Sequence, residues 1–88
     1  MKLIFDIETD GLDAGVIWVV SAIREDGQKF TIEMPTKSDF NAMLTGITEI
    51  IGHNIIAFDI PVVERLLGVS FDNIKITDTL VLSRLYNP

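Results

Sequence analysis

The sequence contains no cysteine and a single histidine, His53. Without cysteine it can form neither disulfide bonds nor thiolate metal sites, which suits a reducing compartment. No apolar run approaches the roughly 18 residues that a transmembrane helix needs, and the first residues lack the pattern of a secretory signal peptide. We therefore expect a cytoplasmic protein with no membrane partner.

Basic residues are also scarce. The 88 residues include 7 Lys and Arg against 13 Asp and Glu, and the formal net charge is −6. This balance opposes nucleic-acid binding, because non-specific affinity comes mostly from neutralising phosphates. Acids that bind divalent cations change the balance, since each cation removes negative charge locally and bridges to phosphate. The composition therefore disfavours a plain DNA-binding module more strongly than a metal-dependent nuclease.

Apolar residues, in contrast, make up 48% of the chain, which is enough for a core. We expect one small domain over residues 1–88. Apolar spacing and turn residues predict the element order β-β-β-α-β-α-β-α. The predicted strands cover 2–7, 16–23, 28–33, 47–52 and 71–77; the predicted helices cover 39–47 after a cap at Ser38, 57–67, and 79–85 after a cap at Asp78 or Thr77.

This order predicts a mixed five-stranded sheet flanked by helices. The Asp26-Gly27 pair is a strong hairpin signal, so the first three strands should be antiparallel and the later ones parallel. In such sheets ligands gather at the carboxyl ends of strands, near the point where the strand order reverses. Asp6 and Glu8 lie at one such end, and His53 and Asn54 lie at another.

Asp6 and Glu8 alternate with apolar residues in the first strand, so their side chains should share one face. Two neighbouring carboxylates raise each other's pKa and oppose joint ionisation unless a cation neutralises them. Oxygen ligands without cysteine favour Mg²⁺ or Mn²⁺ over Zn²⁺. The alternative is that both acids simply belong to the solvated face of an edge strand.

Asp59 is a third candidate ligand, in the first turn of a predicted helix. A carboxylate there is favoured by the helix dipole, typically by about 0.3–1 kcal/mol, so it could equally be an ordinary helix-start acid. Beside a strand that ends in Asp-x-Glu, however, it is the expected third ligand of a two-metal site. The residues by themselves leave both interpretations open.

These segments resemble a known family. The stretch Asp-Ile-Glu-Thr-Asp-Gly-Leu at 6–12 is similar to the first motif of the DEDD 3′–5′ exonucleases, and His53-Asn54 with Phe58-Asp59 is similar to the second. Residues 77–85 resemble the next segment of the proofreading domain in phage-type family A DNA polymerases. The resemblance implies an RNase H-like fold and removal of nucleotides from the single-stranded 3′ end of DNA, within a bacterial host cell if the protein is phage-encoded.

The resemblance also implies roles for individual residues. Asp6 would bridge two Mg²⁺ or Mn²⁺ ions, Glu8 would bind the ion that activates water, and Asp59 would hold the other ion. Five further positions match substrate-binding positions of the family: Thr9, Gly11, Leu12, Asn54 and Phe58. Their alternatives are structural, with Gly11 a turn residue, Asn54 a loop cap, and Leu12 and Phe58 core. His53 is expected to be a loop hydrogen-bonding residue rather than a general base, and Asp78 a helix cap.

The third motif of the family, a Tyr or His followed by Asp, has no counterpart after Arg84. Three explanations fit. The chain is the N-terminal part of a longer exonuclease domain attached to a polymerase domain; a second chain, including a second copy in a homo-oligomer, supplies the missing segment; or the domain is a non-catalytic RNase H-like binding or structural module. The remaining alternative is an unrelated acidic α/β protein.

Overall fold

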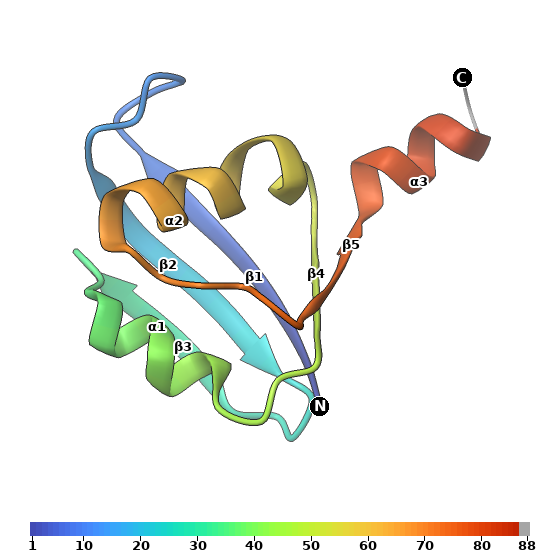
Figure 1. Cartoon of the computed structure of the whole chain (residues 1–88), viewed down its shortest axis with the longest axis horizontal. Helices are drawn as coiled ribbons and strands as arrows, with labels where there is room; N and C mark the ends of the chain where they lie inside the picture. The colour runs from blue at the N-terminus through green and yellow to red at the C-terminus, as the bar shows by residue number, and fades with distance from the viewer. Residues whose placement is uncertain (87–88) are drawn as a thin grey trace.

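A mixed five-stranded sheet forms the centre of the computed structural model, which describes residues 1–86 (Figure 1). The expected domain end at residues 87–88 lies outside this range. In chain order the elements are β1 (Lys2–Thr9), β2 (Ile17–Arg24), β3 (Lys29–Glu33), α1 (Lys37–Leu44), β4 (Glu49–Gly52), the π-helical turn η1 (Ile55–Asp59), α2 (Ile60–Leu67), β5 (Lys75–Asp78) and α3 (Thr79–Tyr86).

The strand order across the sheet is β3-β2-β1-β4-β5. The β1–β2 and β2–β3 pairs are antiparallel, whereas β1–β4 and β4–β5 are parallel. The hairpin between β2 and β3 closes at Gly27, whose φ of 90° suits glycine, and Asp26 accepts a hydrogen bond from the backbone of Gln28. The predicted mixed topology is confirmed.

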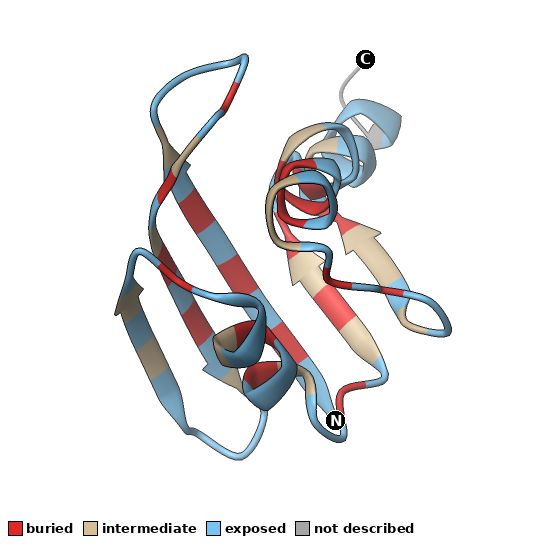
Figure 2. Ribbon diagram, turned by 60° about the vertical axis from the view of Figure 1, so that its left-hand side comes forward, coloured by how far each residue is buried: buried red, intermediate tan, exposed pale blue. Residues whose placement is uncertain are grey.

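The core lies on one face of the sheet. Leu3, Phe5 and Ile7 of β1 are buried and alternate with exposed residues (Figure 2). Helices α1 and α2 cover this face (Figure 1). The Phe5 ring packs edge-on against Phe40 of α1, with centroids 6.2 Å apart, and is stacked against Phe71 at 6.3 Å. These aromatic contacts tie β1, the strand that carries Asp6 and Glu8, to two distant segments.

Helix α1 spans Lys37–Leu44, so it begins before the predicted start at residue 39, and its cap is Thr36 rather than Ser38. The Thr36 hydroxyl accepts from the Asp39 N–H at 3.2 Å, and the Asp39 carboxylate accepts from the Thr36 N–H at 2.8 Å. This reciprocal capping box satisfies two helix-end donors at once. Ser38 lies inside the first turn, so the prediction of its capping role is wrong.

Two other boundaries move for local reasons. The predicted helix from Ala57 is replaced by η1 followed by α2, which ends at the left-handed Gly68 as predicted. Strand β5 begins at Lys75 rather than Phe71, because Phe71–Ile74 close a turn in which Asn73 has a φ of 65°. Phe71 is buried in the core through that turn instead of through a strand.

The opposite face of the sheet is left open by the described residues. Ile4 and Ile23, paired across β1 and β2, are 53% and 46% exposed there. Helix α3 continues away from the sheet beyond β5 (Figure 1), with Val81, Leu82 and Leu85 exposed. An exposed helix this short has little stability of its own. None of the helices within residues 1–86 has the length and apolarity to cross a lipid bilayer.

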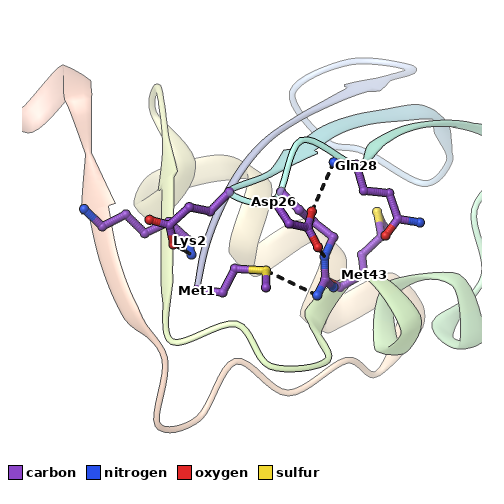
Figure 3. A network of polar contacts seen from close by, with 7 residues as sticks. Met1, Lys2, Asp26, Gln28 and Met43 are labelled. Atoms are coloured by element: carbon purple, nitrogen blue, oxygen red, sulfur yellow. Dashed lines mark hydrogen bonds and ion pairs between the residues drawn. The ribbon is translucent and has the colours of Figure 1, made fainter.

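Met1, Asp26 and Met43 come from three segments and lie close together (Figure 3), and Arg24 at the end of β2 contacts all three. Its guanidinium donates to the Met43 carbonyl of α1 at 2.9 Å and to the Met1 sulfur at 3.3 Å, and it lies 3.6 Å from the Asp26 carboxylate. Because Arg24 is paired with the first residues of β1, this network lies at the edge opposite the carboxyl end of that strand. The network therefore stabilises the fold at a distance from Asp6 and Glu8.

Gly52, the last residue of β4, lies too close to its neighbours for a larger side chain. A Cβ there would overlap the Ile55 side chain and lie 3.0 Å from the Phe5 carbonyl oxygen. We expect Gly52→Ala to lower the free energy of unfolding by about 1–3 kcal/mol, as overpacking usually does. Urea unfolding measures the change.

The matched control is Gly15→Ala, where the nearest atom to the added Cβ, Asp10 Oδ2, lies at an ordinary 3.7 Å. This variant should keep the wild-type stability. Equal stabilities for the two variants would show that the close approach at Gly52 has no energetic consequence.

Candidate active site

The acidic residues gather where β1, β4 and β5 end, because these three strands are parallel and their carboxyl ends meet at one edge. Asp6 and Glu8 are exposed on the same face of β1, as the alternation predicted. Asp78 is the last residue of β5 and is buried. This edge is the place where the sequence led us to expect a ligand.

Asp59 reaches this edge through a contact that spans 52 residues of sequence. Its carboxylate accepts a hydrogen bond from the Ile7 N–H at 3.2 Å, which lays it against β1 at the residue that separates Asp6 from Glu8 in the sequence. Only 4% of Asp59 is exposed, and its side chain makes no capping hydrogen bond to its own helix. Asp59 therefore lies at the start of α2, but its carboxylate accepts its hydrogen bond from β1 and not from its own helix.

The π-helical turn η1 delivers Asp59 to β1. It begins after Asn54, which adopts a left-handed conformation with φ 60°, and its wider turn ends with the Ile60 N–H donating to the Ile55 carbonyl. Ile55, the first residue of this turn, is fully buried. Single π-helical turns are rare and are frequently found at functional sites. Here the turn places an acidic side chain toward the sheet instead of toward solvent.

Burial raises the pKa of Asp59 from 3.8 to about 6. The Ile7 N–H opposes this shift, whereas the negative charges of Asp6 and Asp78 add to it. The ionised form of Asp59 is thus held in an unfavourable setting. A carboxylate with a raised pKa beside other acids is typical of functional sites, and a nearby cation would stabilise its charge.

The donor atoms fit a divalent cation with oxygen ligands, because Asp6 and Asp59 offer carboxylates and the chain has no cysteine thiolate. Within residues 1–86, however, no three acidic or histidine side chains come close enough together to hold a metal ion. The structure brings Asp59 next to Asp6 but does not assemble Glu8 with them into a three-residue group. Of the three expected ligands, Asp6 and Asp59 are therefore near each other, and no complete metal-binding group is present among residues 1–86.

The loop after β1 is built by its own polar side chains. Asp10 accepts from the N–H groups of Gly15 and Val16 at 3.0 and 3.2 Å, and these bonds hold the pKa of Asp10 below its usual value. The Thr9 hydroxyl bonds to both backbone groups of Gly11, whose φ is 147°. Gly11 is therefore a turn residue, and Thr9 holds that turn.

The apolar candidates behave differently from each other. Leu12, in the loop after β1, is 92% exposed, so the alternative that it belongs to the core is wrong. Phe58 is half-buried and packs against the core, as its structural alternative predicted. His53 is a loop hydrogen-bonding residue, as expected, because its Nδ1 lies 3.0 Å from the Thr79 hydroxyl oxygen.

Two residues contribute more than sequence reasoning assigned to them. Asp78 caps α3 through the Leu80 N–H, as predicted, but it also accepts from the N–H groups of Asn54 and Ile56. Gly52 permits the close approach described above. The sequence signal for these roles was their position. Gly52 and Asp78 each end a strand, and the two strands are parallel neighbours, so the two residues lie side by side.

The fold and its acidic edge define the class of the protein, an α/β domain of RNase H-like fold. A family model for the RNase_H superfamily matches residues 3–86, so the chain belongs to that superfamily. Comparison with solved structures finds the family B DNA polymerase from the hyperthermophilic archaeon Pyrobaculum calidifontis, with a TM-score of 0.70 and 17% identity over 90% of this chain. Our chain spans 15% of that polymerase chain, and the likeness is one of fold. Curated proteins gave no significant sequence match.

Asp59→Asn removes the titration of this buried acid while keeping its shape. The folded pKa of about 6 exceeds the unfolded value of about 3.9, so protonation stabilises the fold at low pH. That stabilisation is lost as the pH rises through about 6. Without divalent cations, we expect wild-type stability relative to Asp59→Asn to fall by about 2–3 kcal/mol between about pH 4 and pH 7. Urea unfolding across this range measures it.

Asp72→Asn is the control, because Asp72 is an exposed acid in the turn before β5. Its stability should follow the wild-type pH dependence. A constant difference between wild type and Asp59→Asn at every pH would contradict the raised pKa of Asp59.

Proposed function

We propose that this chain is the N-terminal part of a two-metal 3′–5′ exonuclease domain that removes nucleotides from DNA 3′ ends. The observation that carries the proposal is the placement of the buried Asp59 carboxylate against β1, beside Asp6. Burying one carboxylate next to another is unfavourable for folding. A cation that binds between the two carboxylates best explains why the fold keeps this arrangement. The superfamily membership supports a nuclease.

The acidic residues have separate roles in this proposal. Asp6 would contact both ions, Glu8 the ion nearer the attacking water, and Asp59 the other ion. When bound, Mg²⁺ or Mn²⁺ would stabilise the attacking and leaving oxygens of the phosphodiester. Asp59 is already oriented by the Ile7 N–H, which limits the reorganisation that binding would need.

The substrate strand would approach along the loop after β1. Thr9 and Gly11 shape the turn there, and the exposed Leu12 is free to contact the terminal bases. Asn54 lies on the neighbouring loop, and Phe58 supports that loop from its half-buried position. These five residues are the proposed contacts to single-stranded DNA.

The water-orienting residue and the fourth acid must come from elsewhere. The open face around Ile4 and the exposed apolar side of α3 support packing by an additional segment. We propose that this segment belongs to a longer phage-type family A polymerase, acting in the cytoplasm of a bacterial host. A second copy of the chain, forming a homo-oligomer, is the other source considered.

A second function is favoured by one observation, the lack of a three-residue metal group among residues 1–86. A non-catalytic RNase H-like module would keep the fold and the buried Asp59 without hydrolysing DNA. Direct assays separate the two possibilities.

The first assay is digestion of a 5′-labelled single-stranded oligonucleotide in Mn²⁺. We expect stepwise shortening from the 3′ end, weak in this chain and stronger when the missing segment is supplied, because that segment orients the water. Asp6→Ala should abolish the shortening, whereas Asp72→Ala, which removes an exposed acid elsewhere, should not. If no form of the protein shortens the oligonucleotide, the non-catalytic module is the function that remains.

The second assay measures metal binding without catalysis. For a site with an affinity of ~1 mM, ~10 mM Mn²⁺ should raise the free energy of unfolding by roughly 1.4 kcal/mol. The increase should vanish in Asp6→Ala, because the remaining acids no longer neutralise the ion. If Mn²⁺ stabilises wild type and Asp6→Ala equally, the metal does not bind at this site.

A further inference from the structure

Asp78 is more strongly hydrogen-bonded than a helix cap requires. Its Oδ1 accepts from the Leu80 N–H at 2.9 Å and from the Asn54 N–H at 2.8 Å, and its Oδ2 accepts from the Ile56 N–H at 3.0 Å. The bond to Leu80 alone would cap α3. The other two bonds are directed at a turn that lies more than twenty residues earlier in the sequence.

That turn is η1, which connects β4 to α2 and ends at Asp59. Asp78 is in register with Gly52, the last residue of β4, so its carboxylate lies beside the chain as it leaves the strand. The two N–H groups that it binds belong to the residue that opens η1 and to a residue within its first half. Asp78 thus bridges the ends of two neighbouring strands.

The electrostatic setting agrees with this geometry. Asp78 is only 5% exposed, and burial raises its pKa, but the backbone donors of Ile56, Asn54 and Leu80 together hold the pKa below the usual value. The carboxylate is therefore charged at neutral pH and its hydrogen bonds are charge-assisted. Such bonds are the stronger kind, and two of the three bind the turn at Asn54 and Ile56.

We propose that Asp78 is a positioning residue that holds η1 so that Asp59 is placed against Ile7 and beside Asp6. It acts through the backbone of the turn and does not itself contact substrate. Its consequence for metal binding rests on the proposed function, whereas its control of the turn does not.

The test separates the hold of Asp78 on η1, here called the clamp, from its capping of α3. Asp78→Ser keeps a side chain that caps helices well, but a single hydroxyl cannot accept from all three donors. We expect amide hydrogen exchange at Asn54, Ile56 and Ile7 to accelerate by more than the global loss of stability explains, with the start of α3 still protected. The Mn²⁺ affinity should fall by roughly 10-fold or more, as for other outer-shell partners of metal sites.

Each outcome is decisive. Unchanged protection at Asn54, Ile56 and Ile7 in Asp78→Ser, or a uniform change across the whole chain, would overturn the positioning role. An unchanged Mn²⁺ affinity in a variant with a loosened turn would overturn its relevance to the site. If wild type itself binds no Mn²⁺, the proposed function fails while the exchange data still decide the clamp.

A second variant guards against failure to fold. Asp78→Asn keeps the shape and one carbonyl acceptor but presents an N–H₂ group to one of the backbone donors. It should loosen the same three amides to a smaller extent. Protection of these amides in Asp78→Asn equal to wild type would count against the clamp in the same way.

Discussion

The hydrogen bond between the Ile7 N–H and the Asp59 carboxylate is the contact on which the acidic edge depends. Strand β4 pairs with β1 only as far as Ile4, so among residues 1–86 the later part of β1 has no strand partner on that side. A buried backbone donor needs an acceptor, and Asp59 supplies it. The same bond that gives the Ile7 N–H its acceptor therefore brings a third carboxylate to the residues at the end of β1.

Such an arrangement has a cost in stability. Asp59 is buried and lies near Asp6 and Asp78, and its ionised form is unfavourable in the absence of a cation. The surrounding structure holds it there through the tight approach at Gly52 and the backbone bonds to Asp78. Functional sites are commonly the places where local stability is given up for charge placement.

The two faces of the sheet have different roles. The face under α1 and α2 contains the core, and buried and exposed residues alternate along β1 (Figure 2). In this core the Phe5 ring of β1 contacts two other aromatic rings, which holds the strand in place. The other face presents Ile4 and Ile23 to solvent, and α3 extends away from it. In the proposed function, the further segment that completes the site would pack on this apolar surface beside the acidic end of β1.

The sequence by itself determined the strand alternation, the hairpin at Asp26-Gly27, the order of elements and the gathering of Asp6 and Glu8 on one face. These features follow from local periodicity and turn chemistry, which nearby residues control. Only the tertiary structure decided the partners of Asp59 and Asp78, because both carboxylates bind backbone groups more than twenty residues away. Hydrogen bonds between residues this far apart in the sequence depend on which strands become neighbours. Local sequence patterns do not specify this.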